Sequence, residues 1–581
     1  MKEREAPLPW GWDDTGPVWG ARVFSPRRGQ DHLGLGSVSS DRILPALAPG
    51  INVLTIHPRY FSFYAWVLDS FWLKDLPRTR AAFKEFYRPR EALFAMACHV
   101  CDAPEHETLL GSIVGSQRVR GLSGGEAFDP SYDYIKEPLG GYGLYYRSTM
   151  ELMGALVVAS PENGFPFDAP TAVGRALAAA YSRSIENTAL ATQLADNTPA
   201  GPVTRSELLE FARRACLCQL RAAGDNDLPL LQDLFLHAGA PRQAGARRHT
   251  LRFMLDLSQS CQHLAISQPE FRQLVYFRTL DGSAYAPRAD LTDAARRWRI
   301  YQAREYFAFV FNRLFAWIVR RGLEASGDGL SLVPQEGLWA MVDEALASNH
   351  FAASVGLDDE TVGTRTTAAD LIGAIARRID LTPGVDEVWP RDEVLDENAL
   401  YEWCNNTTDD AETLVAMLAL LLMLHRRVGT PVRTDELSTE HDLTFEGGSL
   451  RIGMSSFFRQ LSRKVMAGVT LSELARWVIH DYVIVQHERV ATNKLPDDTF
   501  RVRRVGSALR FFDQEAPAGF SDSRYHALST TIHELGLVST LLEPHRELTD
   551  SGRRLLEEGD LPAGALDIAA SAYVSPMEPA S

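Results

Sequence analysis

Lysine is scarce in this chain. Six of its 59 basic residues are lysines, and the other 53 are arginines. No acidic residue stands two positions before a lysine, which excludes the (D/E)xK motif of PD-(D/E)xK nucleases. No histidine stands there either, which excludes the HxK motif of phospholipase D-type nucleases. The GK[ST] sequence of a P-loop is also absent, so a P-loop NTPase is excluded.

A further hydrolase motif is missing. The pairs His106–Glu107 and His533–Glu534 lack the second histidine of the HExxH zinc peptidases. The sequence therefore names no reaction. We expect no cofactor and favour a non-catalytic protein over an enzyme.

Long hydrophobic runs are absent too. The longest one, Leu414–Leu424, is too short to span a bilayer and predicts a buried helix. The opening residues, MKEREAPLPWGW, lack the apolar segment of a secretory signal. The six cysteines are scattered, which is typical of reduced thiols. We therefore expect a cytoplasmic protein that does not enter a membrane.

What is present is an ordinary globular composition with an acidic balance. Hydrophobic residues make up 45% of the 581 positions and charged residues 23%. A chain of this length is expected to form about three domains. The net charge of −16 argues against a general nucleic-acid coat but permits a local basic face.

Residues 58–73 carry the densest group of aromatic side chains. Tyr60, Phe63, Tyr64 and Phe71 recur at helical spacing, and other aromatics occupy the remaining sides. A helix that is apolar nearly all round is normally buried, so we interpret this one as the centre of the N-terminal core. The alternative is an aromatic platform for nucleobases.

The periodicity along the chain predicts a mainly α, multi-domain helical protein with a β-hairpin and a C-terminal winged-helix-like domain. Changes in composition suggest the boundaries. The expected parts are an irregular N-terminal segment (1–50), an aromatic-rich helical domain (51–323), an acidic helical middle domain (333–447), a basic C-terminal domain with a helix, hairpin and winged helix (448–560), and a flexible tail (561–581).

Two short patterns in the N-terminal half leave a structural and a functional interpretation open, and we favour the structural one for both. Cys98, His99, Cys101 and His106 begin like a zinc site, but no second ligand pair follows at finger spacing. The surrounding AMACHV also fits a buried helix. The glycine-rich PLGGYG (138–143) predicts a tight loop leading into a helix, or a phosphate or base site at that helix N-terminus.

Positive charge is concentrated near the C-terminus. From Arg459 to Arg510 there are ten basic and five acidic residues, a balance of +5. TFRVRRV and ALRFF flank Gly506–Ser507, which predicts a two-residue β-hairpin. If this hairpin meets DNA, we expect the phosphate contacts to come from the arginines Arg501, Arg503, Arg504 and Arg510.

Residues 521–558 predict a helix, a short strand, a turn and a capped helix, which is the order of a winged helix-turn-helix. If the unit binds DNA, the groove-facing residues are expected to be Arg524, His526, Ser529, Thr530 and His533. Winged helices also dock proteins, so this alternative stays open.

A metal-dependent alternative rests on a histidine–aspartate pair. His480 and His487 are seven residues apart on one helix face, and Asp481 follows His480. Phosphohydrolases of the HD type bind a metal through such residues. The structural alternative is a helix whose polar side contacts the hairpin or a ligand phosphate.

Four stretches carry a resemblance to known proteins: GINVLTIHPRYFSFYAWVL, PLGGYGLYYRSTMELMGAL, QAREYFAFVFNRLF, and WVIHDYVIVQHERVATNKLPDDTFRVRR with LRFFD. The chain resembles uncharacterised bacterial proteins of restriction and phage-defence gene clusters. The resemblance implies one subunit of a multi-protein antiviral machine whose partners are ATPases, helicases or nucleases, and it assigns no active-site residue. The hypotheses are therefore a non-catalytic subunit that binds double-stranded DNA or such partners, a metal-dependent nuclease or phosphohydrolase, and a pure protein scaffold.

Overall fold

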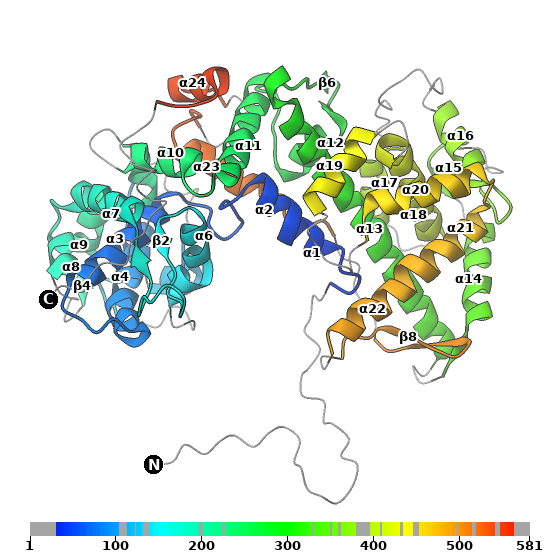
Figure 1. The fold of residues 1–581 in the computed structure, drawn as a ribbon, viewed down its shortest axis with the longest axis horizontal. Coiled ribbons are helices and arrows are strands. Elements are labelled where there is room, and N and C mark those ends of the chain that lie inside the picture. The colour runs from blue at the N-terminus through cyan, green and yellow to red at the C-terminus, as the bar shows by residue number, and fades with distance from the viewer. Residues whose placement is uncertain are drawn as a thin grey trace, which may run out of the picture. The chain divides into compact units, whose positions relative to one another are not determined.

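The structure is a computed structural model of the chain, and helices make up most of it (Figure 1). The expectation of a mainly α protein is confirmed. The residues that the structure describes are 31–103, 113–122, 124–131, 137, 139–196, 202–222, 227–327, 331–348, 351–357, 362–378, 395–406, 410–429, 434–444, 452–495, 498–513, 519–540 and 546–562. Among them, no helix is long and apolar enough to cross a membrane.

Contacts divide the chain into two compact units. Unit 1 comprises residues 1–43, 275–279 and 296–521, and unit 2 comprises residues 44–274, 280–295 and 522–581. Neither unit is continuous in sequence. The hairpin belongs to unit 1 and the residues after Asp522 belong to unit 2, whereas the sequence analysis grouped both in one C-terminal domain.

Unit 2 is built around helix α3 (Arg59–Leu73), which confirms the prediction for residues 58–73. Its aromatic side chains are buried on nearly every side, as a core helix requires. The Phe63 ring stacks on Phe94 with centroids 4.2 Å apart, and Tyr60 stacks on Tyr64 at 5.4 Å. These rings are therefore core and do not form an exposed platform.

Further short and long helices complete unit 2. They are α2 (Leu44–Leu47), α4 (Arg80–Val100), α5 (Ser116–Val119), α6 (Arg147–Leu152), α7 (Ala172–Ile185), α8 (Ala189–Asp196), α9 (Arg205–Ala215), α10 (Leu228–His237), α11 (Pro241–Ser260), α12 (Gln268–Phe277, whose last turn belongs to unit 1), α23 (Tyr525–Glu534) and α24 (Asp550–Glu558). Its strands form short antiparallel pairs. These are β1 (Ala127–Phe128) with β4 (Val203–Thr204), and β2 (Leu156–Val157) with β3 (Ala169–Pro170). Near the unit boundary, β5 (Thr279–Leu280) pairs with β6 (Ser283–Ala284).

Unit 1 packs around α13 (Thr292–Ser326) and α18 (Asp410–Leu424). Residues Leu414–Leu424 are buried without interruption, so the longest apolar run is a core helix as expected. The other helices are α1 (Gly36–Val38), α14 (Gln335–Ser348), α15 (Phe351–Ser354), α16 (Ala368–Arg378), α17 (Glu397–Asn406), α19 (Thr434–Thr444), α20 (Met454–Met466), α21 (Leu471–Trp477) and α22 (Val485–Asn493).

A three-stranded antiparallel sheet lies in unit 1. Its spatial order is β7 (Val333–Pro334), β9 (Ala508–Phe511) and β8 (Val502–Val505). Because β9 is the central strand, the predicted hairpin is anchored on one side by β7. Residues 379–394 of the acidic middle region lie outside the described residues.

Candidate functional site

The hairpin β8–β9 forms where the sequence predicts it. Val505 pairs with Ala508 across the turn, and Gly506 has a φ of +63°, a conformation that favours glycine at this position. Val502, Leu509 and Phe511 line the buried side of the hairpin. Phe511 packs so closely on Gly322 of α13 that a Cβ atom there would lie 2.3 Å from its ring. The hairpin is therefore a fixed part of unit 1.

The opposite side of the hairpin carries an unusual pair of charges. Arg503 lies directly across the strands from Arg510, and Val505 lies across from Ala508. We call these four residues the outer face. The guanidinium carbon of Arg503 lies 5.6 Å from the centroid of the Phe500 ring, and that of Arg510 lies 5.3 Å from the centroid of the Phe512 ring. In the part of the chain that the structure describes, no carboxylate forms an ion pair with either arginine.

The two remaining predicted arginines are placed differently. Arg504 points to the other side of β8, where its Nη2 lies 2.6 Å from Glu488 Oε2 on α22. Arg501 is only 8% exposed, so the prediction that it contacts phosphate is wrong in this structure. Its position at the start of the hairpin, covered by α22, accounts for the burial: its backbone N–H donates to His487 Nε2 at 2.9 Å.

His487 is a structural residue. It is fully buried, Nε2 accepts the hydrogen bond from Arg501, and Nδ1 lies 3.2 Å from the His32 carbonyl oxygen. Burial lowers the pKa of His487 to about 3, which keeps the ring neutral. Both nitrogens are used inside the fold, so His487 offers no lone pair to a metal. His480 instead pairs with its neighbour Asp481, Nδ1 to Oδ1, at 2.6 Å on a partly exposed surface.

Helix α23 is placed in the core of unit 2. Eight of its ten residues are buried, and its Glu534 forms a buried pair with His57, with Oε1 2.6 Å from Nδ1. Thr530 is 1% exposed, so the prediction that it faces a DNA groove is wrong. A recognition helix must present one face to the bases, whereas the only exposed residue of α23 is His526.

The other residues predicted to read DNA are Arg524 and His526 at the start of α23, the buried Ser529 and the half-buried His533. Arg524 adopts a φ of +61° and donates from Nη1 to the carbonyl oxygens of Ala48 (3.2 Å) and Ile51 (2.7 Å). It therefore fixes the chain locally. His526 is exposed. After α23 the described residues show a single bridge, Val538 to Leu548, and then α24; the expected wing, 541–545, lies outside the described residues. A winged helix is thus not established.

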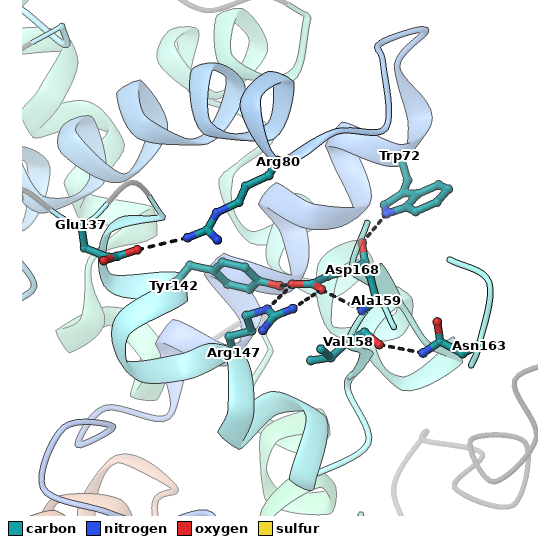
Figure 2. A network of polar contacts seen from close by, with 9 residues as sticks. All are labelled: Trp72, Arg80, Glu137, Tyr142, Arg147, Val158, Ala159, Asn163 and Asp168. Carbon is teal, nitrogen blue, oxygen red and sulfur yellow. Dashed lines mark hydrogen bonds and ion pairs between the residues drawn. The ribbon is translucent and has the colours of Figure 1, made fainter. Parts of the chain in front are cut away.

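A polar pocket lined in part by Leu139 and Gly143 lies beside the glycine-rich loop, and Figure 2 shows the polar contacts of its charged residues. Its volume is about 190 Å³, and its charged lining residues are Arg80, Glu137, Arg147 and Asp168. Buried Asp168 accepts hydrogen bonds from Tyr142 Oη (2.7 Å), Arg147 Nε (2.5 Å) and the Ala159 N–H (3.0 Å). Arg80 lies 3.3 Å from Glu137 through Nη2 and Oε1. Each arginine already faces a carboxylate, so the pocket presents a balanced charge.

The glycine-rich loop itself is a packing device. The N–H of Gly141 donates to both carboxylate oxygens of buried Glu91 at 3.1 Å, and the N–H of Tyr142 donates to the Tyr87 hydroxyl at 3.1 Å. Gly140 has a φ of +50°, and a Cβ atom there would lie 2.3 Å from Glu91 Oε2. The internal carboxylate Glu91 thus occupies the position that an external phosphate would need. This supports the structural interpretation of the loop.

A group of three cysteines could bind a metal ion, and the sequence pointed to only one of them, Cys101. The thiols of Cys101, Cys216 and Cys218 lie within 4.8 Å of one another in unit 2. The pair Cys98–Cys101 is recognisable in the sequence, where no second ligand pair follows it at finger spacing. The C-x-C at 216–218 is that pair, but more than a hundred residues separate it from the first, so only the fold brings the two together.

Comparison of this chain with protein-family models, with curated proteins and with solved structures found no match. The interpretation of its function therefore depends on the residues and their geometry.

Proposed function

We propose that this chain is a non-catalytic subunit that binds double-stranded DNA through the outer face of hairpin β8–β9. The observation that carries the proposal is the cross-strand pair of Arg503 and Arg510. Like charges directly opposite each other destabilise a sheet. A fold gains nothing from such a pair, whereas two adjacent phosphates of a DNA backbone neutralise it.

The surroundings of the pair favour a phosphate ligand. The rings of Phe500 and Phe512 lie beneath the two guanidinium groups and orient them without neutralising them. Val505 at the turn is 45% exposed, so the tip of the hairpin is accessible. A guanidinium group matches phosphate through its planar set of donors.

The small number of outer-face arginines limits the strength of the DNA contact. Two arginines neutralise about two phosphates, which sets a salt dependence of about −1.8 in log K against log salt. The remainder of a chain with net charge −16 repels DNA. Tight binding therefore requires a second DNA contact from a partner subunit, acting through effective concentration. This agrees with the resemblance to antiviral gene clusters, and we propose an ATPase, helicase or nuclease as the partner.

The direct test is DNA binding across a salt series. Fluorescence anisotropy with a short labelled duplex is measured for the wild-type chain and for the Arg503→Ala/Arg510→Ala variant. The wild type is expected to bind at low salt with a slope near −1.8, and the double variant is expected to lose most of that slope. The matched control is Arg504→Ala, which removes a neighbouring arginine already paired with Glu488 and should leave the slope unchanged.

Two results would contradict the proposal. One is the absence of wild-type binding at the lowest salt concentration. The other is a salt slope that Arg504→Ala reduces as much as the double variant does. DNA binding would then depend on the total charge of the chain and not on the outer face. For the antiviral role, the measurement is phage plating on cells that carry the surrounding gene cluster. The double variant should restore plaques, and the Arg504→Ala control should not.

A further inference from the structure

Three of the six cysteines of the chain lie together in unit 2. The Cys101 and Cys218 sulfurs are 3.6 Å apart, and Cys216 lies within 4.8 Å of both. Cys98 lies in the last turn of α4, three residues before Cys101, and its sulfur is outside this group of mutually close thiols. The other two cysteines, Cys261 and Cys404, are buried and are not part of this cluster.

The separations fit one tetrahedral ion. Sulfurs bound 2.3 Å from a zinc ion at tetrahedral angles lie about 3.8 Å from one another. The observed limits, 3.6 Å for the Cys101–Cys218 pair and 4.8 Å among Cys101, Cys216 and Cys218, bracket this value. Sulfurs that converge on one point suit a single ion. In an iron–sulfur cluster, by contrast, the cysteines are distributed over two or more irons.

The backbone brings the sulfurs together at two helix ends. Cys98 lies in the last turn of α4, and Cys101 follows immediately as its C-cap. Cys216 is the C-cap of α9, and Cys218 lies in the 3₁₀ turn Leu217–Arg221 that follows. Helices α4 and α9 pack against each other. An ion bound here would therefore join two C-terminal helix ends that are distant in sequence.

The polar surroundings suit thiolate ligands. Gln219 donates from Nε2 to the Cys218 sulfur at 3.2 Å, as expected of a group that orients a metal ligand. Arg213 pairs with Asp102 next to Cys101, with Nη2 2.8 Å from Oδ2, which places a cation beside the cluster. Arg59 Nη1 holds the Cys216 carbonyl oxygen at 2.6 Å. The position of each half of the cluster is thus fixed by residues that are not cysteines.

We infer that Cys101, Cys216 and Cys218 bind a zinc ion that joins α4 to the end of α9, and that Cys98, one turn before Cys101 on α4, completes the set of thiol ligands when the ion is bound. Four sulfurs around a closed tetrahedral ion leave no position for a substrate, so the site is structural. Because such sites contribute their binding free energy to folding, removal of the ion lowers the stability of unit 2. This inference does not depend on the proposed DNA contact.

Metal content of the purified full-length chain is the first measurement. Protein prepared under reducing conditions without added zinc should contain close to one zinc per chain by plasma mass spectrometry. A mercurial reagent that modifies thiols should release it, as followed with a chromogenic chelator. Cobalt exchanged into the site should give the intense visible absorption of a tetrahedral cobalt–thiolate complex.

Serine variants then assign the ligands. Cys101→Ser and Cys218→Ser should each lose most of the zinc and unfold at a lower temperature than the wild type. Cys261→Ser is the matched control, since it removes a buried cysteine from the same unit and should retain the full zinc content. If the cluster variants do not fold, the cobalt spectrum of the wild-type chain still decides the question.

Three results would overturn the inference. The first is wild-type protein with neither zinc nor a cobalt–thiolate spectrum. The second is a zinc content that Cys101→Ser and Cys218→Ser leave unchanged. The third is a Cys101–Cys218 disulfide in metal-free protein, detected by non-reducing peptide mapping. A full zinc content in Cys98→Ser would overturn the assignment of the fourth ligand.

Discussion

Buried arginines in unit 2 and the outer-face arginines of unit 1 differ in what their guanidinium groups contact. Arg247 is fully buried and donates to the carbonyl oxygens of Leu234 (3.1 Å), Ala238 (2.6 Å), Pro49 (3.2 Å) and Phe235. Arg90 likewise donates to carbonyl oxygens of Phe86 and Leu194. In contrast, Arg503 and Arg510 contact rings and each other's strand.

This difference shows how the same residue type can be structural or functional. A guanidinium group surrounded by carbonyl oxygens satisfies backbone acceptors at helix ends, and its donors have no capacity left for a ligand. A guanidinium group over a ring keeps its donors available at the surface. In a chain with 53 arginines, the local acceptors therefore separate the two roles better than the charge count does.

The largest expected effect on stability comes from a buried arginine, Arg247. Arg247→Met keeps the apolar stem but leaves several buried carbonyl oxygens without donors. We expect the free energy of unfolding of unit 2 to fall by roughly 3–5 kcal/mol. Arg503→Met, the same substitution on the outer face, should change it by less than about 0.5 kcal/mol. Urea unfolding of both variants is the measurement, and equal losses would remove the distinction between the two kinds of arginine.

A pair of glycines makes the next comparison. Gly140 and Gly506 both have positive φ, but a Cβ atom at Gly140 would collide with Glu91, and one at Gly506 would meet nothing within 4 Å. Gly140→Ala should therefore cost about 2–4 kcal/mol, from strain and collision together. Gly506→Ala should cost about 1–2 kcal/mol, from backbone strain alone. Thermal unfolding checks both, and a larger loss at Gly506 would contradict the packing role of the loop.

The sequence predicts local features of both regions well. Helical spacing located α3, the apolar run located α18, and alternation around Gly506–Ser507 located the hairpin. These signals are local, because each depends on neighbours within a few residues. Burial of Thr530 and Arg501, and the meeting of two cysteine pairs, depend on segments that only the fold brings together. Side-chain partners of this kind have no signature at fixed spacing.

Acid should weaken unit 1 through three buried histidines. Burial lowers the pKa of His487 to about 3 and those of His32 and His425 to about 4. In the unfolded chain they titrate near 6.5, so that state binds the protons first. The stabilisation is therefore complete above pH 6.5 and is lost as the pH falls through about 4. Between these two pH values, each histidine adds about 1.4 kcal/mol per pH unit to the slope of the free energy of unfolding against pH.

Urea unfolding between pH 7.5 and pH 4.5 measures that slope. His487→Gln should make it shallower by about one proton, because glutamine can still accept the Arg501 hydrogen bond but cannot titrate. The control is His480→Gln, which makes the same substitution at a partly exposed site and leaves the buried His487 in place. A slope that neither variant alters would show that His487 is not protected as the structure places it.

The smallest effect tests the outer face most directly. Arg503→Thr removes the repulsion with Arg510 and introduces a residue that favours strands, so it should raise the free energy of unfolding by a few tenths of a kcal/mol. Arg504→Thr breaks the pair with Glu488 and should lower it by about 0.5–1 kcal/mol. Two identical substitutions at adjacent positions are thus expected to have opposite signs.

The sign matters for the proposed function. If Arg503→Thr raises the free energy of unfolding and lowers the affinity for DNA, Arg503 is present for its ligand and not for the stability of the fold. Precise urea unfolding of both threonine variants, beside anisotropy with the same duplex, measures the two quantities together. If Arg503→Thr destabilises the chain as much as Arg504→Thr, the cross-strand arginine pair supports the hairpin itself. The proposal of DNA binding would then lose the observation on which it depends, since a pair that stabilises the fold needs no phosphate to explain it.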